Sequence, residues 1–284
     1  MDIEKLNNIL DEVFTPEIDD VISKQKLIGV RLSGGIDSAF MTFLTMSKYP
    51  NIKILPITMF NKLRPAAMDA VDNVINTLKL LNPNNNNLLD SEISFFDSSG
   101  FVKTQEMIDE FEKTGKKYNP KDIFQRKWFY SLWKKYENLN IYFSGETLNP
   151  PIEEQPKIIT GELRKFPEDR NHKKEKVLSK RRAHHIQAPN NFKYEFRPFR
   201  NKNKKQVAQW VKSLGLDKTL FPVTETCETE VEMYKEYGKP DFFNLVYKKP
   251  GAEPCKRCWP CREKYWAYGY YDFGATETIN EFKL

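Results

Sequence analysis

Many hydrophobic residues of this chain fall into short runs of branched side chains. Longer stretches with apolar positions at helical spacing separate these runs. The run from Lys26 to Leu32 is rich in branched residues, which favours a buried strand. Similar runs predict further strands over Ile52 to Phe60, Ile93 to Phe96 and Leu139 to Ser144. The other stretches predict helices over Asp2 to Val21, Ala39 to Met46, Pro65 to Leu81 and Pro120 to Tyr136.

This alternation of strands and helices predicts the fold class. Strand–helix–strand units pair their strands in parallel through right-handed crossovers, so we expect an α/β protein with an open, doubly wound, mainly parallel sheet and flanking helices. From Pro150 to Asn191 proline and basic residues dominate, which predicts an irregular excursion. Order returns at Tyr194 to Phe199, and a helix over Lys204 to Leu216 is ended by Gly215.

The chain divides into two parts in this interpretation. Residues 1–220 form the α/β domain, with the excursion at about residues 150–191, and residues 221–284 form a small C-terminal element that carries all of the cysteines. The mean hydropathy of −0.66 and the lack of a membrane-spanning apolar run predict a soluble protein with no membrane partner. The acidic start does not resemble a secretory signal, so we expect a cytoplasmic location.

Basic residues are unevenly distributed along the chain. The formal net charge is +6, and Lys and Arg greatly outnumber Asp and Glu between Lys157 and Lys205. Such a stretch is typical either of a surface for phosphates, RNA included, or of a solvated loop in a chain that is rich in lysine and asparagine. The second interpretation is favoured because no regular aromatic–basic alternation accompanies the charge. Nucleic acid therefore stays open as a partner without being the favoured one.

The most informative segment reads Ser-Gly-Gly-Ile-Asp-Ser and spans Ser33 to Ser38, between the first predicted strand and the helix after it. Open α/β sheets bind ligands at such a position. The glycines let the backbone approach a ligand closely, and the helix N–H groups, the helix dipole and the two hydroxyls suit phosphate oxygens. The alternative is a turn that uses its glycines only for geometry. The Walker pattern and the dinucleotide pattern of three spaced glycines are both absent.

The hexapeptide resembles the Ser-Gly-Gly-x-Asp-Ser signature of the PP-loop ATP pyrophosphatases. The resemblance implies an adenine nucleotide alpha hydrolase-like fold and an enzyme that cleaves ATP between its α and β phosphates. A carboxylate or carbonyl oxygen would become the adenylate, and a nitrogen or sulfur nucleophile would displace AMP. The residues implied at the ATP phosphates are Ser33, Gly34, Gly35, Ile36 and Ser38. Asp37 adds a carboxylate among phosphates, which is repulsive unless a cation intervenes, so we expect Asp37 to organise Mg²⁺.

The chain has four cysteines, and their spacing indicates a metal site. They are Cys227, Cys255, Cys258 and Cys261, of which the last three form a C-x-x-C-x-x-C run. Four thiolates with such spacings can close a tetrahedral Zn²⁺ site, which would be structural because no coordination position stays open. The alternatives are a [4Fe–4S] cluster, disulfides and buried free thiols. Zinc is favoured, and disulfides are disfavoured by the expected cytoplasmic location.

Within that superfamily the cysteine arrangement resembles 7-cyano-7-deazaguanine (preQ0) synthase, the QueC family. The family has Ser-Cys after its final core helix and then C-x-x-C-x-x-C-Arg, where this chain has Thr226-Cys227 and then Cys255 to Arg262. The family's Pro-Leu, lysine and Leu-Gly positions are matched in order and spacing by Pro198-Phe199, Lys204 and Leu214-Gly215. The resemblance thus extends from the first predicted strand to Arg262.

This resemblance implies an AMP- and pyrophosphate-forming C–N ligase of queuosine biosynthesis. 7-Carboxy-7-deazaguanine would be adenylated on its carboxylate, ammonia would give the amide, and a second activation would give the nitrile, preQ0. The implied catalytic residues are Asp37, Lys204 and Arg126, and Gly145 is implied near the substrate. Lys204 and Arg126 would neutralise phosphates or the carboxylate, with ordinary surface cations as the alternative for each. The sequence does not determine the oligomeric state, and a homodimer stays open.

Two departures from the family pattern concern the substrate. The gap between the first cysteine and the triplet, Glu228 to Pro254, is much longer than in the family, and the loop Glu146 to Pro151 lacks the family's Asp and Tyr-Pro-x-Cys-Arg pattern. The resemblance therefore supports ATP chemistry more directly than it supports the deazaguanine substrate. Two other functions compete: a PP-loop tRNA-modifying enzyme of the thiolase or lysidine type, and a non-catalytic descendant that binds nucleotide.

Overall fold

The computed structural model describes residues 1–61, 66–82, 86–96, 128–129, 131–158, 170, 178–182, 192–226, 254, 256 and 259–272. Within these residues one sheet has the strand order β3-β2-β1-β4-β6-β5. Its strands are β1 (Leu27–Arg31), β2 (Lys53–Asn61), β3 (Glu92–Phe96), β4 (Leu139–Ser144), β5 (Leu178–Arg182) and β6 (Phe192–Phe196). All neighbours pair in parallel except β5, which pairs antiparallel with β6. The predicted α/β, mainly parallel sheet is confirmed.

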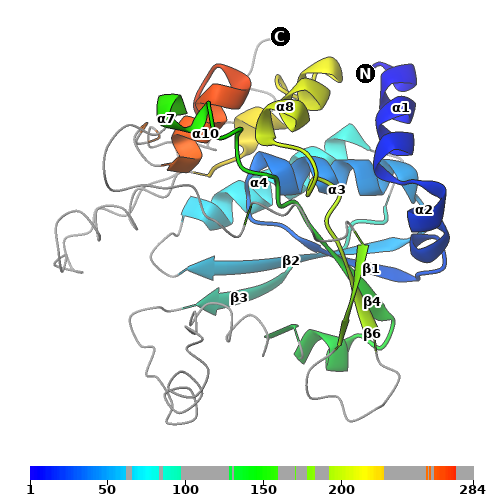
Figure 1. Ribbon diagram of the computed structural model, residues 1–284. Coiled ribbons are helices and arrows are strands. Elements are labelled where there is room, and N and C mark those ends of the chain that lie inside the picture. Colours follow the sequence, from blue (N-terminus) through cyan, green and yellow to red (C-terminus); the bar gives the residue numbers. More distant parts are fainter. Residues whose placement is uncertain are drawn as a thin grey trace, which may run out of the picture.

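Helices cover both faces of this sheet. They are α1 (Ile3–Val13), α2 (Pro16–Ile22), α3 (Ile36–Lys48), α4 (Ala66–Leu81), α7 (Gln155–Ile158), α8 (Lys204–Ser213), α10 (Trp259–Tyr268) and the short 3-10 helix η2 (Phe221–Val223). Figure 1 shows α3, α4, α8 and α10 together on one side of the strands. On the other face Phe129 and Leu132, in a helical stretch, pack against Leu27, Leu139 and Tyr142. The sheet is therefore doubly wound, as expected.

Strand β1 is the centre of the sheet and is buried on both faces. It lies between β2 and β4, where Val30 is opposite Pro56 on one side and Phe143 on the other. The side chains of Ile28 and Val30 are fully buried. A continuous apolar run, rather than an alternating one, is typical of a parallel strand that helices cover on both faces.

The leading helix differs from its prediction over Asp2 to Val21. The structure has two helices there, because α1 ends at Val13 and α2 begins at Pro16. Proline lacks a backbone N–H and fits only the first turn of a helix, so Pro16 stops α1 from continuing. The buried face of α1 consists of Leu6, Ile9, Leu10 and Val13, as its apolar spacing predicts.

Two described parts of the excursion are regular, although the sequence predicts an irregular segment. Residues Gln155–Ile158 form α7, and Leu178–Arg182 form β5 at the edge of the sheet. β5 reads Leu-Ser-Lys-Arg-Arg, which has no strand-like alternation of apolar and polar positions. Its order comes from the ladder with β6, and such a tertiary contact leaves no periodic signal in the sequence.

The C-terminal element shares its core with the α/β domain. Phe221, Val223, Ala267 and Tyr268 belong to the same cluster of buried residues as α1, α3 and α8. The rings of Phe221 and Tyr268 lie 4.6 Å apart between centroids. Over the residues that the structure describes, no helix combines the length and apolar character that crossing a membrane requires.

Candidate active site

The segment Ser33 to Ser38 lies at the point where the strand order of the sheet reverses. From β1 the chain moves through α3 to β2 on one side, and β4 later joins β1 on the other side. The connections that leave the carboxyl ends of β1 and β4 therefore run in opposite directions along the sheet, and ligands of open α/β sheets bind in the crevice outside such a pair of ends. Ser33 to Ser38 follow β1, and Gly145 follows β4 directly. We call Ser33 to Ser38 the phosphate loop.

The two glycines of the phosphate loop are constrained in different ways, Gly34 by its backbone angle and Gly35 by a neighbouring side chain. Gly34 has a φ angle of +81°, in the left-handed region where a side chain causes strain. Gly35 is the N-cap of α3, and as a glycine it offers no side-chain acceptor to the first N–H groups of the helix. A Cβ atom at Gly35 would lie 2.6 Å from Cγ2 of Thr226. The open helix start suits an anionic ligand.

Gly145 packs directly against the phosphate loop. A Cβ atom at Gly145 would lie 2.9 Å from the carbonyl carbon of Asp37 and 2.9 Å from the backbone nitrogen of Ser38. No L side chain fits there without displacing one of the two backbone segments. The sequence predicts Gly145 near the substrate, and the structure brings it to the loop; its role toward a substrate stays a prediction.

The two hydroxyls of the loop contact each other. Ser33 Oγ and Ser38 Oγ are 3.2 Å apart, and the backbone N–H of Ser33 donates to Ser38 Oγ at 3.2 Å. Ser38 in turn donates to the carbonyl oxygen of Gly35 at 2.9 Å. Ser38 is buried, whereas Ser33 is exposed. The two serines thus hold the ends of the loop together, and Ser33 is the more exposed of the two.

Lys204 and Asp37 form an ion pair beside the loop. Nζ of Lys204 lies 2.5 Å from Oδ2 of Asp37, and only 8% of the lysine side chain is exposed. Lys204 is the first residue of α8, and Asn203 and Gln206 form a capping box at the N-terminus of this helix. Burial disfavours the charged ammonium, but the carboxylates of Asp37 and Glu263 outweigh it and raise the pKa of Lys204. The lysine is therefore a cation at neutral pH.

Two further charged residues complete this cluster, and the sequence did not single out either of them. Glu263 on α10 is 1% exposed, and its Oε2 lies 3.6 Å from Nζ of Lys204. Nη2 of Arg170 lies 2.7 Å from Oε1 of Glu263. Burial disfavours the charge of Arg170, yet Glu263 more than offsets this and raises the pKa of the guanidinium. We call Asp37, Lys204, Glu263 and Arg170 the charged cluster.

The basic stretch from Lys157 to Lys205 is predicted to be a solvated loop, but several of its described cations are buried. Arg170, Arg200 and Lys204 are 8%, 1% and 6% exposed. Arg197 lies 2.8 Å from Glu195, a carboxylate that is itself buried. A charged residue is buried only where an opposite charge compensates it, so part of this excess of positive charge balances internal carboxylates.

The C-terminal segment supports the loop through a second buried ion pair. Lys264, fully buried on α10, contacts the carboxylate of Asp272, and Asp272 Oδ2 accepts from the backbone N–H of Thr226 at 3.0 Å. The neighbouring N–H of Glu225 donates to the carbonyl oxygen of Gly34 at 2.9 Å. Residues from the far end of the chain thus fix the backbone position of the phosphate loop.

The predicted metal ligands are only partly described. Cys261 is 1% exposed and lies in α10, whereas Cys227, Cys255 and Cys258 lie outside the described residues, as does Arg126. No group of three possible metal ligands occurs within the described ranges. Asp37 is a suitable ligand for Mg²⁺. Its Oδ1 is buried and accepts no hydrogen bond from the residues that the structure describes. Such an oxygen is a donor of the kind that Mg²⁺ prefers.

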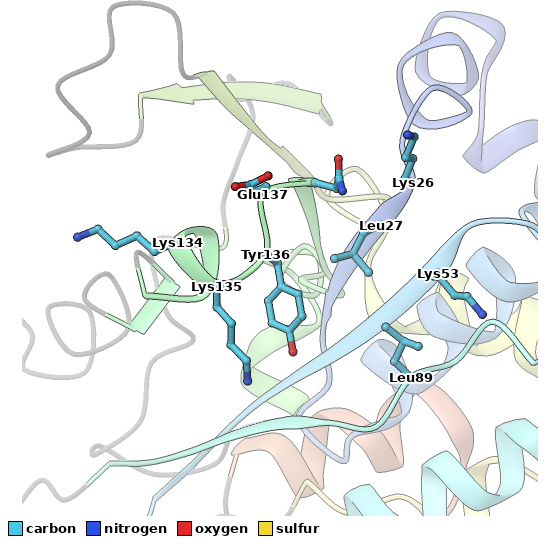
Figure 2. Close-up of a pocket in the computed structure, with 9 residues that line it drawn as sticks. Lys26, Leu27, Lys53, Leu89, Lys134, Lys135, Tyr136 and Glu137 are labelled. Carbon is cyan, nitrogen blue, oxygen red and sulfur yellow. The ribbon is translucent and has the colours of Figure 1, made fainter.

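A hollow of about 520 Å³ lies at the amino ends of β1 and β2, opposite the strand ends that the phosphate loop follows. Its lining includes Lys26, Lys53, Lys134 and Lys135, together with Leu27 and Leu89. In Figure 2 the side chain of Lys134 points away from the two leucines. Leu27 begins β1, and the phosphate loop follows the other end of that strand. The hollow is therefore separate from the charged cluster.

Comparisons with known proteins give structural likeness only. No protein-family model matches the chain, and no curated protein matches it. The U34-tRNA thiolase NcsA from Methanococcus maripaludis, solved with its [4Fe–4S] cluster, is similar over 98% of this chain and 88% of its own, with 15% identity and a TM-score of 0.45. The NH3-dependent NAD synthetase from Campylobacter jejuni is similar over 85% and 90%, with 15% identity and a TM-score of 0.38. The NMN synthetase from Francisella tularensis is similar over 98% and 90%, with 14% identity and a TM-score of 0.39. At such values the chemistry of this chain has to be inferred from its own residues.

Proposed function

We propose that this chain is an ATP-dependent enzyme of the PP-loop class, which transfers AMP from ATP to an oxygen of an acceptor and releases pyrophosphate. One observation carries the proposal. A complete Ser-Gly-Gly-x-Asp-Ser segment opens α3 at the reversal point of the sheet, with the buried ammonium of Lys204 beside it. A glycine turn that serves geometry alone has no need of a buried lysine and a carboxylate at the same place.

The residues of the loop have separate roles in this proposal. The uncapped N–H groups at the start of α3 and the Ser33 hydroxyl bind the β and γ phosphates. Lys204 balances their charge and the charge that develops when the α–β bond breaks. Asp37 would hold Mg²⁺ through Oδ1, and this ion would supply further neutralisation of the phosphates. Glu225 and Gly145 keep the loop backbone in its position.

We further propose 7-carboxy-7-deazaguanine as the acceptor and ammonia as the nucleophile, which would make the enzyme a 7-cyano-7-deazaguanine synthase. The support is the resemblance of the cysteine spacing and of the position of Lys204 to that family. Carboxylate oxygen is a poor leaving group and AMP is a good one. Adenylation therefore lets ammonia displace AMP to form the amide, and a second activation of the amide oxygen leads to the nitrile. In this proposal the four cysteines hold a structural Zn²⁺ ion, and Arg126 neutralises the carboxylate or the phosphates.

The test is pyrophosphate and AMP release from ATP with Mg²⁺, with and without 7-carboxy-7-deazaguanine plus ammonium, and with products identified by mass. Stimulated release with a nitrile product supports the full proposal, and an amide as the final product limits the enzyme to the first activation. If the protein binds ATP but the acceptor does not stimulate pyrophosphate release, the ATP site is supported and this acceptor is excluded. A protein that does not bind ATP contradicts the proposed class.

A second candidate function is the modification of tRNA with the same adenylation chemistry. The observation in its favour is that Lys26 and Lys53, two exposed lysines, lie at the hollow, which is separate from the charged cluster. Binding to phosphates through such amines weakens steeply as salt rises. Tight, salt-sensitive binding of tRNA, together with release of pyrophosphate that tRNA stimulates, would favour this function over the small acceptor.

A further inference from the structure

We propose that Glu263 is a positioning residue, which together with Arg170 holds the ammonium of Lys204 at the phosphate loop when ATP and Mg²⁺ are bound. This inference rests on the proposed ATP site and adds two residues that act on it through Lys204. Neither residue belongs to the loop: Glu263 comes from α10, and Arg170 comes from the segment between α7 and β5.

The geometry divides the two oxygens of Glu263 between two cations. Oε1 lies 2.7 Å from Nη2 of Arg170, and Oε2 lies 3.6 Å from Nζ of Lys204. The same ammonium lies 2.5 Å from Oδ2 of Asp37. The charged cluster is therefore a chain in the order Arg170, Glu263, Lys204 and Asp37, with alternating charge. Its formal charges cancel before any ligand arrives.

Lys204 needs a second carboxylate for a physical reason. It is the first residue of α8, where the positive end of the helix dipole disfavours a cation, and its side chain is almost fully buried. Removing one partner of a buried ion pair leaves an uncompensated charge and is strongly destabilising. If Asp37 holds Mg²⁺ through Oδ1, its negative charge would be shared between the ion and the ammonium, and Glu263 would be the carboxylate whose charge is still available to Lys204. Its contribution is thus largest in the state that binds ATP with Mg²⁺.

Arg170 in turn fixes Glu263 and connects it to the loop after β4. The guanidinium donates to the carbonyl oxygen of Thr147 at 3.1 Å and to its hydroxyl at 2.9 Å. It also donates to the carbonyl oxygen of Leu148 at 3.2 Å. This loop follows Gly145, which packs on the phosphate loop. Arg170 thus positions the Glu263 carboxylate relative to the site, so it acts through Glu263.

Helix α10 has other contacts that keep it folded without Glu263. Lys264 is paired with Asp272, and Ala267 and Tyr268 are part of the hydrophobic core. Nζ of Lys212 also donates to the carbonyl oxygen of Tyr268 at 2.7 Å. A Glu263→Gln substitution keeps the size of the side chain and removes only its charge. We therefore expect this variant to fold with a lower melting temperature, because Arg170 and Lys204 lose one buried carboxylate partner.

The experiment measures binding of a non-hydrolysable ATP analogue with Mg²⁺ by calorimetry, on the full chain and well below its melting temperature. We expect Glu263→Gln to weaken binding about 10- to 100-fold, the range that orienting partners contribute at metal sites. Glu263→Asp, which keeps the charge, should recover part of this loss. Glu12→Gln is the matched control, because Glu12 also pairs with a lysine, Lys202, but lies at the surface. It should bind like the wild type.

A double-mutant cycle separates positioning from a general structural role. If Glu263 acts through Lys204, Glu263→Gln should weaken binding no further in a Lys204→Met background. Equal losses in both backgrounds, or Glu263→Gln binding as tightly as Glu12→Gln, would overturn the proposal. Arg170→Gln provides a second variant and should weaken binding in the same Lys204-dependent way. If the wild type itself binds no analogue, the proposed ATP site fails, and that outcome is distinct from a wild type that binds while Glu263→Gln has no effect.

Discussion

The ammonium of Lys204 lies 2.5 Å from Oδ2 of Asp37, although the two residues are 167 positions apart in the chain. Asp37 is in the first turn of α3, and Lys204 is in the first turn of α8. Both helices follow parallel strands, so both begin at the carboxyl edge of the sheet and their first turns converge. A carboxylate and a cation that the sequence indicated separately thus form one ion pair at the phosphate loop.

Replacing Lys204 by methionine tests the role of this cation. We expect Lys204→Met to lower the rate of pyrophosphate release about 10²- to 10³-fold, the cost of losing one preorganised electrostatic group at a reacting centre. The control is Lys24→Met, which removes an exposed lysine that pairs with Asp20 at the surface and should keep the wild-type rate. A Lys204→Met enzyme with an unchanged rate would show that the lysine is not part of the reaction.

Asp37→Asn tests the predicted Mg²⁺ ligand. The buried Oδ1 of Asp37 is the candidate donor, and an amide is a weaker ligand for a hard cation than a carboxylate. We expect the variant to lose Mg²⁺-dependent turnover over a titration of the ion, while thermal unfolding monitors whether it is folded. Full retention of the wild-type Mg²⁺ dependence would mean that Asp37 does not organise the ion.

Gly145→Ala tests the close packing of β4 against the loop. The added Cβ would lie 2.9 Å from the backbone of Asp37 and Ser38, so the loop has to shift. We expect a loss of stability of about 1–3 kcal/mol in urea unfolding and weaker ATP binding.

The control for this variant is Gly29→Ala in the middle of β1. Its Cβ would lie 2.7 Å from Cδ1 of Ile57, the end of a core side chain, and it does not meet the loop. It should lower stability and leave the affinity for ATP unchanged. If both alanine variants bind ATP alike, the packing at Gly145 has no influence on the site.

The metal content of the protein tests the cysteine site. We expect one zinc ion per chain by elemental analysis, and loss of that ion in Cys261→Ser, because a structural site needs all four thiolates. Loss of the ion should also lower the melting temperature, since α10 carries Cys261 and packs in the core. Iron and sulfide in the protein, after purification without oxygen, would instead identify a cluster.

Pattern and chemistry in the sequence were sufficient for the central parts of the molecule. The branched run ending at Leu32 predicted β1, and the glycines after it predicted a turn at a ligand-binding edge. Both predictions depend on neighbouring residues, whose spacing determines which face they bury and which dihedrals they can adopt. The same reasoning placed Leu139–Ser144 in a strand with its bounds correct.

The sequence by itself determined the α/β alternation, the order of strand, loop and helix around Ser33 to Ser38, and two of the four charges at the site. The tertiary structure alone decided the edge strand β5 and the places of Arg170 and Glu263. Arg170 and Glu263 are 93 positions apart, and each looks like an ordinary surface charge in its own segment. Hydrophobic periodicity reports the local surroundings of a residue, whereas the burial of a charge depends on the partner that the fold brings to it.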